Sequence, residues 1–401
     1  MPDEYMMTMV GGHEEEHANR SGDKHRYKTM MGTQKLSPDE LKALAADVAR
    51  LSSLLTRERE SLPDAYLKDK RLRQAYLLYF VPSNLAKIHL PLRELSLHPK
   101  SILTKERLSI LDLGSGPGTA TLGALDFFSQ QGKRPLLQFT AMDQVGENLK
   151  DAEDLFRSWR DRTGINASLR TIRSKVEKAM DRLSGDRYDI IMLSNALNEL
   201  FHGDEDRIAK RILFLENILD RLLTPDGSCI IIEPALRETS RELLMVRDGL
   251  LEEGFSLYAP CLGNGKCPAL ANPKDWCHED IPWDPPELVK EIDSRTGLRK
   301  DSLKFSYLVL RKDGLSLADI HGADSFRVVS EPLVSKGKIE FYICGKGRRR
   351  PFVRLDKDKS VSNETFESMK RGDIVGFERV TDDGKRFKAE KGTGVMIKSA
   401  R

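Results

Sequence analysis

A short apolar segment, Leu108–Leu113, runs directly into the glycine-rich sequence Gly114-Ser115-Gly116-Pro117-Gly118 and then into the helical pattern of Thr119–Ser129. The glycines permit a tight turn and let a ligand approach the backbone. The helix that follows offers free N–H groups and the positive end of its dipole. A dinucleotide fingerprint would need its third glycine at position 119, which is a threonine. The G-x-G-x-G spacing instead predicts a loop that binds S-adenosylmethionine.

Two acidic residues extend this prediction. Asp112 stands two positions before the first glycine, where we expect it to reach the methionine amino group. Asp143 ends the next apolar segment, where a carboxylate can accept both ribose hydroxyls. The predicted cofactor site consists of Asp112, Gly114, Ser115, Gly116, Gly118, Asp143, Gln144 and Ser194.

Strand and helix patterns alternate from about residue 107 onward. Five strands are predicted over Leu108–Leu113, Leu136–Met142, Ala167–Ile172, Tyr188–Ser194 and Cys229–Glu233. The intervening helices are Thr119–Ser129, Asn148–Arg160, Ile208–Leu223 and Arg237–Glu252, and Phe255–Tyr258 and Phe305–Arg311 form a last strand pair. This rhythm predicts an α/β fold, a Rossmann-like seven-stranded class I methyltransferase sheet with helices on both faces.

The composition along the chain divides it into four parts. Residues 1–35 are polar and without periodicity, which predicts a disordered tail. Residues 36–100 form a helical N-terminal domain that begins at the capping box Ser37–Glu40, with a second helical block over 65–96 broken around Pro82 and Pro91. The methyltransferase domain covers 101–320 and contains an irregular, cysteine-rich insert at 259–303. Short strands at Phe326–Val329, Ile339–Ile343, Phe352–Leu355 and Ile374–Arg379 predict a small, basic, β-barrel-like C-terminal domain over 321–401.

The end of the fourth strand borders the place where the methyl group would lie, because ligands of such sheets bind at the carboxyl ends of strands. The acceptor-side candidates there are Ser194, Asn195, Asn198 and Glu199. The Asn/Asp-Pro-Pro-aromatic signature of amino-group methyltransferases is absent from this position. The sequence therefore identifies no catalytic residue.

The net charge of +3 excludes a polycation, so that any nucleic-acid affinity must come from local patches. No apolar run is long enough for a membrane span, and no secretory signal or clear transit peptide is recognisable. We expect a monomer without membrane contacts, in the cytoplasm, or in the mitochondrial matrix if the source is eukaryotic.

Four of the five cysteines form a candidate metal site. Cys261, Cys267 and Cys277 have the spacing C-x5-C-x9-C, and Cys344 follows at the end of a predicted strand. Four thiolates can hold an iron–sulfur cluster or a zinc ion, and free buried thiols are the alternative. The paired short spacings typical of zinc are absent, which favours a cluster. Cys229 lies inside a strand and is interpreted as core.

A basic segment runs from Lys336 to Lys359, with nine Lys or Arg against three acidic residues and aromatic residues between them. Such a surface is suited to RNA, because phosphate neutralisation and base stacking need these residue types. A solvated charged face is the alternative. The RNA-binding candidates are Lys346, Arg348, Arg349, Arg350 and Arg354.

Taken together, these segments resemble the methyltransferase-like family associated with the small ribosomal subunit, which has bacterial members and a mitochondrial assembly factor. The matching segments are Ala75–Pro82, Leu111–Gly118, Ser194–Leu200, Pro260–Cys277 and Lys304–Leu310, together with the C-terminal segment through Cys344. The resemblance implies a [4Fe–4S] cluster on Cys261, Cys267, Cys277 and Cys344, and contact with small-subunit ribosomal RNA or a pre-ribosomal particle.

Three functions are compatible with these patterns. The first is a cofactor-binding protein with an iron–sulfur cluster that methylates or binds small-subunit RNA during ribosome assembly and translation. The second is a non-catalytic RNA-binding assembly factor, a pseudoenzyme that retains the cofactor pocket. The third is a small-molecule methyltransferase. The basic C-terminal segment argues against this third function.

Overall fold

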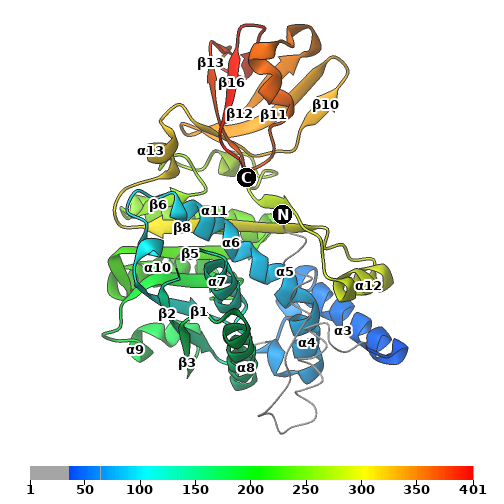
Figure 1. Ribbon diagram of the computed structural model, residues 1–401, viewed down its shortest axis with the longest axis vertical. Coiled ribbons are helices and arrows are strands. Elements are labelled where there is room, and N and C mark those ends of the chain that lie inside the picture. The colour runs from blue at the N-terminus through cyan, green and yellow to red at the C-terminus, as the bar shows by residue number, and fades with distance from the viewer. Residues whose placement is uncertain (1–35, 64, 133, 401) are drawn as a thin grey trace.

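The computed structural model describes residues 36–63, 65–132 and 134–400 (Figure 1). The expectation of a disordered tail over residues 1–35 lies outside the described residues. Within the described ranges no helix is long and apolar enough to cross a membrane.

The central sheet runs in the order β3-β2-β1-β4-β5-β8-β6, with a further strand, β7, paired to β8. Its strands are β1 (Arg107–Leu113), β2 (Leu136–Asp143), β3 (Ala167–Arg173), β4 (Tyr188–Ser194), β5 (Leu223–Pro234), β6 (Ser256–Ala259), β7 (Glu279–Pro282) and β8 (Ser302–Arg311). The first five are parallel, whereas β8 runs antiparallel to both β5 and β6. All seven predicted strands are present, and β5 and β8 begin earlier than predicted.

The cysteine-rich insert is more regular than expected. It contributes β7, which extends the sheet to eight strands, and helix α12 (Glu287–Thr296). The expectation of an irregular segment was wrong here, because its prolines stand at the ends of these elements, with Pro286 directly before α12 and Pro282 at the end of β7. The stretch from Cys261 to Cys277 contains one short helical turn, η8 (Pro268–Ala271), and no strand.

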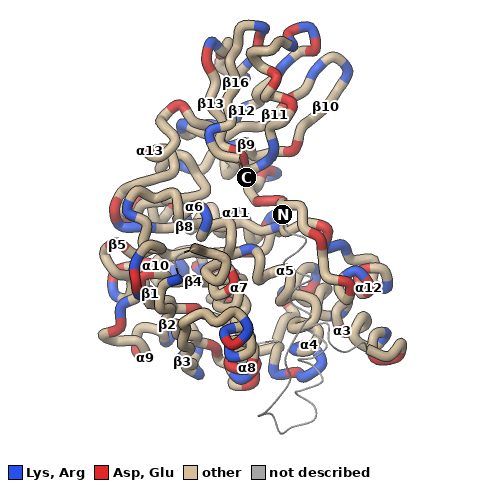
Figure 2. The backbone as a smooth tube through the Cα atoms, in the orientation of Figure 1, with Lys and Arg blue, Asp and Glu red and all other residues tan. Residues whose placement is uncertain are grey.

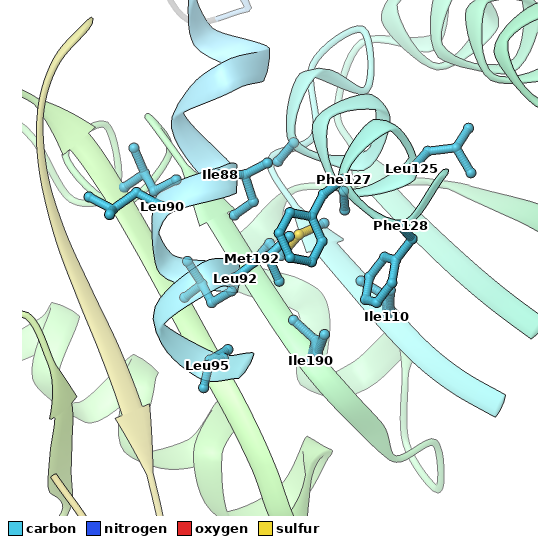
Figure 3. Close-up of a cluster of buried hydrophobic side chains, with 14 of the residues drawn as sticks. Ile88, Leu90, Leu92, Leu95, Ile110, Leu125, Phe127, Phe128, Ile190 and Met192 are labelled. Carbon is cyan, nitrogen blue, oxygen red and sulfur yellow. The ribbon is translucent and has the colours of Figure 1, made fainter. Parts of the chain in front are cut away.

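Helices cover both faces of the central sheet. One face carries α6 (His89–Ser96), α7 (Thr119–Ser129) and α8 (Gly146–Thr163), and the other carries α9 (Ala179–Arg182), α10 (Arg207–Leu222) and α11 (Arg237–Glu252). Figure 3 shows the first face, where Leu92 and Phe128 from two helices meet Ile110 and Ile190 of the sheet. Burial of these side chains fixes the strand ends that form the candidate site.

The N-terminal helices pack on each other and on the insert. They comprise α3 (Pro38–Thr56), the turns η2 (Arg59–Ser61) and η3 (Tyr66–Lys68), α4 (Lys70–Ala75), η4 (Tyr76–Phe80), α5 (Val81–Leu85) and η5 (Ala86–Ile88). The capping box of Ser37 and Glu40 is formed as predicted.

The predicted breaks at Pro82 and Pro91 were wrong, since the helical segments follow one another without a gap from Lys70 to Ser96. Pro82 follows a wide π turn in which the Val81 N–H bonds to the Tyr76 carbonyl, and Pro91 stands in the first turn of α6. Proline lacks the backbone N–H donor, but at these positions a helix does not need that N–H for a hydrogen bond.

Gly123 on α7 brings the N-terminal helices close to the sheet. A Cβ atom at this position would lie 2.3 Å from the Leu85 carbonyl oxygen and 2.6 Å from a methyl group of Ile88. We expect Gly123→Ala to lower the free energy of unfolding by about 3 kcal/mol, because backbone cannot move aside as a flexible side chain can. Urea unfolding would measure this. Gly132→Ala, where a Cβ meets nothing within 4 Å, is the control; equal effects of the two would contradict the prediction.

A second sheet forms the C-terminal part, in the order β14-β15-β12-β11-β9-β13-β16 with β10 paired to β11. Its strands are β9 (Phe326–Val328), β10 (Leu333–Ser335), β11 (Lys338–Gly345), β12 (Arg348–Leu355), β13 (Ile374–Glu378), β14 (Thr381–Asp382), β15 (Phe387–Ala389) and β16 (Gly394–Ser399), and α13 (Leu317–His321) precedes it. The four predicted strands are present. In the described part of the chain the end strands β14 and β16 do not pair, so hydrogen bonds do not close this sheet into a barrel.

Candidate functional site

The glycine loop joins β1 to α7 in the predicted way. Gly114, Gly116 and Gly118 all have positive φ, which favours glycine over other residues. A Cβ atom at Gly114 would collide with Ala196 at 2.7 Å, so this glycine lets the loop lie against the segment after β4. A Cβ atom at Gly116 would meet nothing within 4 Å. The loop therefore has open space beside its central glycine.

Asp112 lies under this loop and is almost fully buried. Its Oδ2 accepts hydrogen bonds from the Thr121 backbone N–H at 3.1 Å and the Thr121 hydroxyl at 2.7 Å. Its other oxygen, Oδ1, is buried without a hydrogen-bond partner. Burial raises the pKa of Asp112 to about 6, partly offset by Thr121. A buried carboxylate oxygen without a partner indicates that a donor group from outside the chain belongs there.

Asp143 closes the other side of the loop. Its Oδ2 accepts the Gly116 N–H at 2.9 Å, and its Oδ1 accepts the Val145 N–H at 2.8 Å and the Asn148 side-chain amide at 3.1 Å. Burial raises the pKa of this carboxyl, and these three donors offset the rise. The structure thus brings together the loop and the strand end that the sequence assigned to one site. Ser115 is buried in the loop, and Gln144 is exposed beside it.

The segment after β4 holds the four acceptor-side candidates in different environments. Ser194 and Asn195 are half-buried, Asn195 with positive φ, and Glu199 is exposed. Asn198 is buried, and its side chain accepts a hydrogen bond from Arg59 and donates one to Glu233. Because both ends of this amide are occupied, Asn198 orients its neighbours and does not present a free group to an acceptor.

Several residues of this region were missed at the sequence level. Glu233 is the penultimate residue of β5, is 1% exposed, and has a pKa that burial raises to about 7. An acidic residue at the end of an apolar strand is a signal that could have identified it. Arg59 and Tyr66 come from a stretch without periodicity, so no local pattern points to them.

Two tyrosines of the N-terminal helices lie over the cofactor loop. Burial raises the pKa of Tyr76 to about 12, with Glu199 and Asp143 adding to the rise and Asn84 and Thr119 opposing it. Burial also raises the pKa of Tyr66 well above its usual value, again together with Glu199 and Asp143. Both hydroxyls therefore lie near the carboxylates of the loop region, so the N-terminal helices form one wall of the candidate site.

A second cavity contains the four predicted metal ligands. Cys261, Cys267 and Cys277 of the insert and Cys344 of β11 all line it. Burial raises the pKa of Cys267 to about 11 and that of Cys344 to about 12, and Cys261 adds to the rise at both. Such coupling requires the thiols to be neighbours. Cys229 is completely buried in β5, as expected of a core residue.

Arginines and a carboxylate hold the cysteine loops in place. Arg247 on α11 donates to the carbonyls of Gly263 and Gly265, between the first two cysteines. Arg241, six residues earlier on the same helix, donates to the carbonyls of Asn272 and Asp275 at 2.8 and 2.6 Å. Asp248 accepts the Cys267 N–H. The loop conformation is thus fixed by the protein itself.

Among the described residues no three His, Cys, Asp or Glu side chains are close enough together to hold one metal ion. The four thiols share a cavity without forming a tight tetrahedral set. The iron–sulfur assignment consequently remains a proposal.

The basic candidates of the C-terminal sheet differ in accessibility. Arg354 is 1% exposed and binds the Asn363 carbonyl and Glu367, so it is a structural residue and its expected role in RNA contact is corrected. Arg350 forms a bidentate pair with Asp382, and Arg349 lies half-buried at the cysteine cavity. Lys346 pairs with Asp324, whereas Arg348 is exposed with no ion pair among the described residues. Figure 2 accordingly shows basic and acidic segments alternating along this sheet.

A family model described as "Mitochondrial small ribosomal subunit Rsm22" matches residues 69–392. The chain belongs to the Rsm22 family. The match covers the candidate cofactor loop, the cysteine insert and nearly all of the C-terminal sheet. The resemblance inferred from the sequence is thereby confirmed for this Rsm22 family member.

Solved structures with partial similarity include several methyltransferases. A putative class I S-adenosylmethionine-dependent methyltransferase from Listeria monocytogenes is 13% identical, with 69% of this chain and 83% of that chain covered and a TM-score of 0.37. The human methyltransferase 10 domain containing protein is 14% identical, with 70% and 99% covered and a TM-score of 0.36. A methyltransferase from Geobacter sulfurreducens in complex with S-adenosyl-L-homocysteine is 16% identical, with 57% and 90% covered and a TM-score of 0.30. No curated protein matches the Rsm22 family member described here.

Proposed function

We propose that this protein binds S-adenosylmethionine and acts on, or binds, the RNA of the small ribosomal subunit during its assembly. The observations that carry the proposal are the open space beside Gly116, the hydrogen bond from the Gly116 N–H to Asp143, and the buried, partnerless Oδ1 of Asp112 in the strand before the loop. This arrangement offers a carboxylate to the amino group and backbone donors and a second carboxylate to the ribose, as the cofactor needs. The family description supports the small-subunit partner and a place in the mitochondrial matrix.

Within this proposal the chain's own residues position the reactants. S-Adenosylmethionine would supply an electrophilic methyl group. Asp112, Gly116 and Asp143 would hold the donor, and the segment Ser194–Glu199 would face the acceptor. Catalysis by such a site is mostly a matter of orientation. The division of the chain into helical, methyltransferase and C-terminal parts belongs to the same proposal.

The four cysteines of the second cavity fit a [4Fe–4S] cluster better than zinc. A cluster places its thiolate ligands farther apart than a single tetrahedral ion does, which agrees with four thiols that share a cavity without forming a compact set. Arg247 and Arg349 at the cavity would balance the negative charge of a thiolate-bound cluster. Since Cys344 belongs to β11 and the other three to the insert, the cluster would join the two sheets.

A non-catalytic role as an assembly factor is the second candidate, and the bonds of Asn198 favour it. Its amide is held by Arg59 and Glu233, so the acceptor side contains no free catalytic group at this position.

Three measurements test the proposal: titration of the full chain with S-adenosyl-L-homocysteine, crosslinking to RNA in cells at nucleotide resolution, and mapping of ribosomal RNA methyl marks in cells without the protein. Cofactor binding with small-subunit crosslinks supports the proposal. A mark that disappears in its absence supports methyl transfer, and an unchanged set of marks supports the second candidate. Absence of both cofactor binding and small-subunit crosslinks would contradict both.

The arginines of β12 provide a further prediction. Arg348→Ala is expected to weaken RNA binding and to reduce the slope of log affinity against log salt by about 0.7, because it removes one exposed phosphate contact. Arg354→Ala should instead lower the free energy of unfolding by about 2 kcal/mol, because it breaks buried charged hydrogen bonds. Fluorescence anisotropy with RNA and urea unfolding measure the two effects. A larger loss of RNA affinity in Arg354→Ala without a loss of stability would reverse the assignment.

A further inference from the structure

Two short turns of the N-terminal helices, η2 and η3, lie between α3 and α4 in the chain. Arg59 of η2 is half-buried, and its Nη2 donates a hydrogen bond to the side-chain oxygen of Asn198. Asn198 is itself held in place, because Arg211 donates to its backbone carbonyl at 2.8 Å and its side-chain amide donates to Glu233. The bond from Arg59 therefore attaches η2 to a fixed point in the segment after β4.

The other turn, η3, is attached to α8. Arg73, which is 7% exposed, donates to the carbonyls of Leu67 and Lys68 at 2.9 and 3.3 Å. Its Nε also lies 3.2 Å from a carboxylate oxygen of Asp151 on α8. The Leu67 side chain is buried as well. Several interactions together therefore hold η3 against α8.

These two attachment points lie at the two ends of the glycine loop. A Cβ atom at Gly114 would lie 2.7 Å from the Cβ atom of Ala196, in the segment after β4 to which η2 is bound. A Cβ atom at Gly118 would lie 3.0 Å from the Cβ atom of Ala152, in the part of α8 to which η3 is bound. The turns η2 and η3 therefore bridge the loop from one end to the other, while the space beside Gly116 stays open.

The two attachments differ in how firmly they are made. No residue of η2 is buried, and its attachment is a bond between one arginine and one amide. The attachment of η3 combines the bonds of Arg73 with the buried side chain of Leu67. Ala65, directly before η3, has a φ of 56°, a left-handed conformation that is unfavourable for a residue with a Cβ atom. Strained residues of this kind occur in switch segments. We therefore expect η2 to be the end that opens.

We propose that the bond from Arg59 to Asn198 is a latch, which η2 must release before S-adenosylmethionine can enter or leave the site. The inference rests on the proposed function and adds control of cofactor exchange to it. With the latch closed, η2 and η3 shield the bound cofactor from water, and with the latch open the entrance to the loop is free. Arg59 is then a positioning residue that acts through Asn198.

The test compares the rates of S-adenosyl-L-homocysteine binding to the wild-type chain and to Arg59→Met by surface plasmon resonance. Methionine keeps an apolar stem and removes the donor. Both the association rate and the dissociation rate should rise about 10- to 100-fold, the range expected for one charged hydrogen bond. The equilibrium Kd should change less than about threefold, because the latch bond is present with and without ligand and its loss favours the open state equally in both.

Arg57→Met is the matched control, because Arg57 is an exposed arginine at the C-cap of α3, two residues before the latch. It should leave both rates unchanged. If Arg59 contacted the ligand directly, Arg59→Met would raise the dissociation rate and the Kd without raising the association rate. If Arg59 were purely structural, the variant would unfold at lower urea concentration and keep both rates. Either result would overturn the inference and leave the proposed function intact.

Hydrogen–deuterium exchange of the wild-type chain provides a second measurement that needs no variant. Saturating S-adenosyl-L-homocysteine should slow amide exchange in η2 and η3, because the bound ligand favours the closed state, and it should leave β13 and β16 of the second sheet unchanged. Ligand binding that leaves exchange in η2 unchanged would overturn the inference. A wild-type chain that binds no S-adenosyl-L-homocysteine would overturn both the inference and the proposed cofactor site.

Discussion

Asp112→Asn is expected to weaken binding of S-adenosyl-L-homocysteine about 10- to 100-fold. The substituted amide can still accept a bond from Thr121, but it places an N–H₂ group where the partnerless Oδ1 now lies. The loss of one charged hydrogen bond is worth about 1.5–3 kcal/mol, which gives this range. Isothermal titration calorimetry with the full chain measures the effect.

The same substitution should not destabilise the fold. Burial raises the pKa of Asp112 to about 6, so ionising this carboxyl costs more free energy in the folded chain than in the unfolded chain, although the carboxylate still predominates at neutral pH. A carboxyl with a raised pKa stabilises the protein below its unfolded pKa, and that contribution is lost as the pH rises through about 6. The neutral side-chain amide of the Asp112→Asn variant does not ionise, so the variant does not lose this stability as the pH rises. Asp126→Asn, a buried carboxyl on α7 bonded to Gln130, is the control and should keep full affinity.

Cofactor binding should also depend on pH through this carboxyl. The carboxylate is needed to pair with the amino group, so affinity should fall about tenfold between pH 7.5 and pH 5 as Asp112 becomes protonated. The Asp112→Asn variant should lose most of this dependence, and any slope that remains would belong to Asp143, whose pKa is also raised by burial. An unchanged slope in the variant would remove Asp112 from the proposed site.

Cys344→Ala is expected to reduce the iron content of anaerobically purified protein from about four atoms per chain to fewer than one, because a [4Fe–4S] cluster needs four thiolates. Iron and acid-labile sulfide assays measure the change. Cys344 is the ligand that β11 contributes, whereas the other three cysteines lie in the insert. Loss of the cluster should therefore also increase protease cleavage between α13 and β9, where the second sheet is joined to the first.

Cys229→Ala is the matched control for this experiment. Cys229 is fully buried in β5 and is not among the residues that line the cysteine cavity. The Cys229→Ala variant should keep its iron, although its free energy of unfolding will fall by an amount typical of a small cavity. Equal iron loss in both variants would point to general misfolding, and wild-type protein that is colourless with one zinc per chain would exclude the cluster.

The central sheet could be predicted in detail because its signals are local. An apolar strand followed by glycines and a helix defines β1, the loop and α7, and the same alternation defines the next strands. The insert was harder to predict, since the four-residue strand β7 is too short for a visible period and pairs with residues of β8 that lie 20 to 26 positions farther along the chain. Similarly, the prolines at 82 and 91 indicated breaks because the sequence does not show a π turn.

The residues of the candidate site also differ in whether local sequence signals could predict them. The glycine spacing, Asp112 and Asp143 could be assigned from the sequence because they follow strands whose carboxyl ends must meet. The bond from Arg59 to Asn198 joins residues 139 positions apart, and the bond from Tyr79 to Asp293 joins the N-terminal helices to the insert. No local pattern records such contacts, since they arise only when separate elements are packed together.

The amino-acid sequence by itself determined the strand–loop–helix unit around Gly114–Gly118, the order of the main elements and the set of four cysteines. The tertiary structure alone decided that Gly116 faces open space, that one oxygen of Asp112 is left without a partner, and that the four cysteines share one cavity. It also decided that Arg354 is buried and cannot contact RNA. The physical reason is that residue type and spacing set local conformation, whereas burial and partner choice depend on which distant surfaces exclude water together.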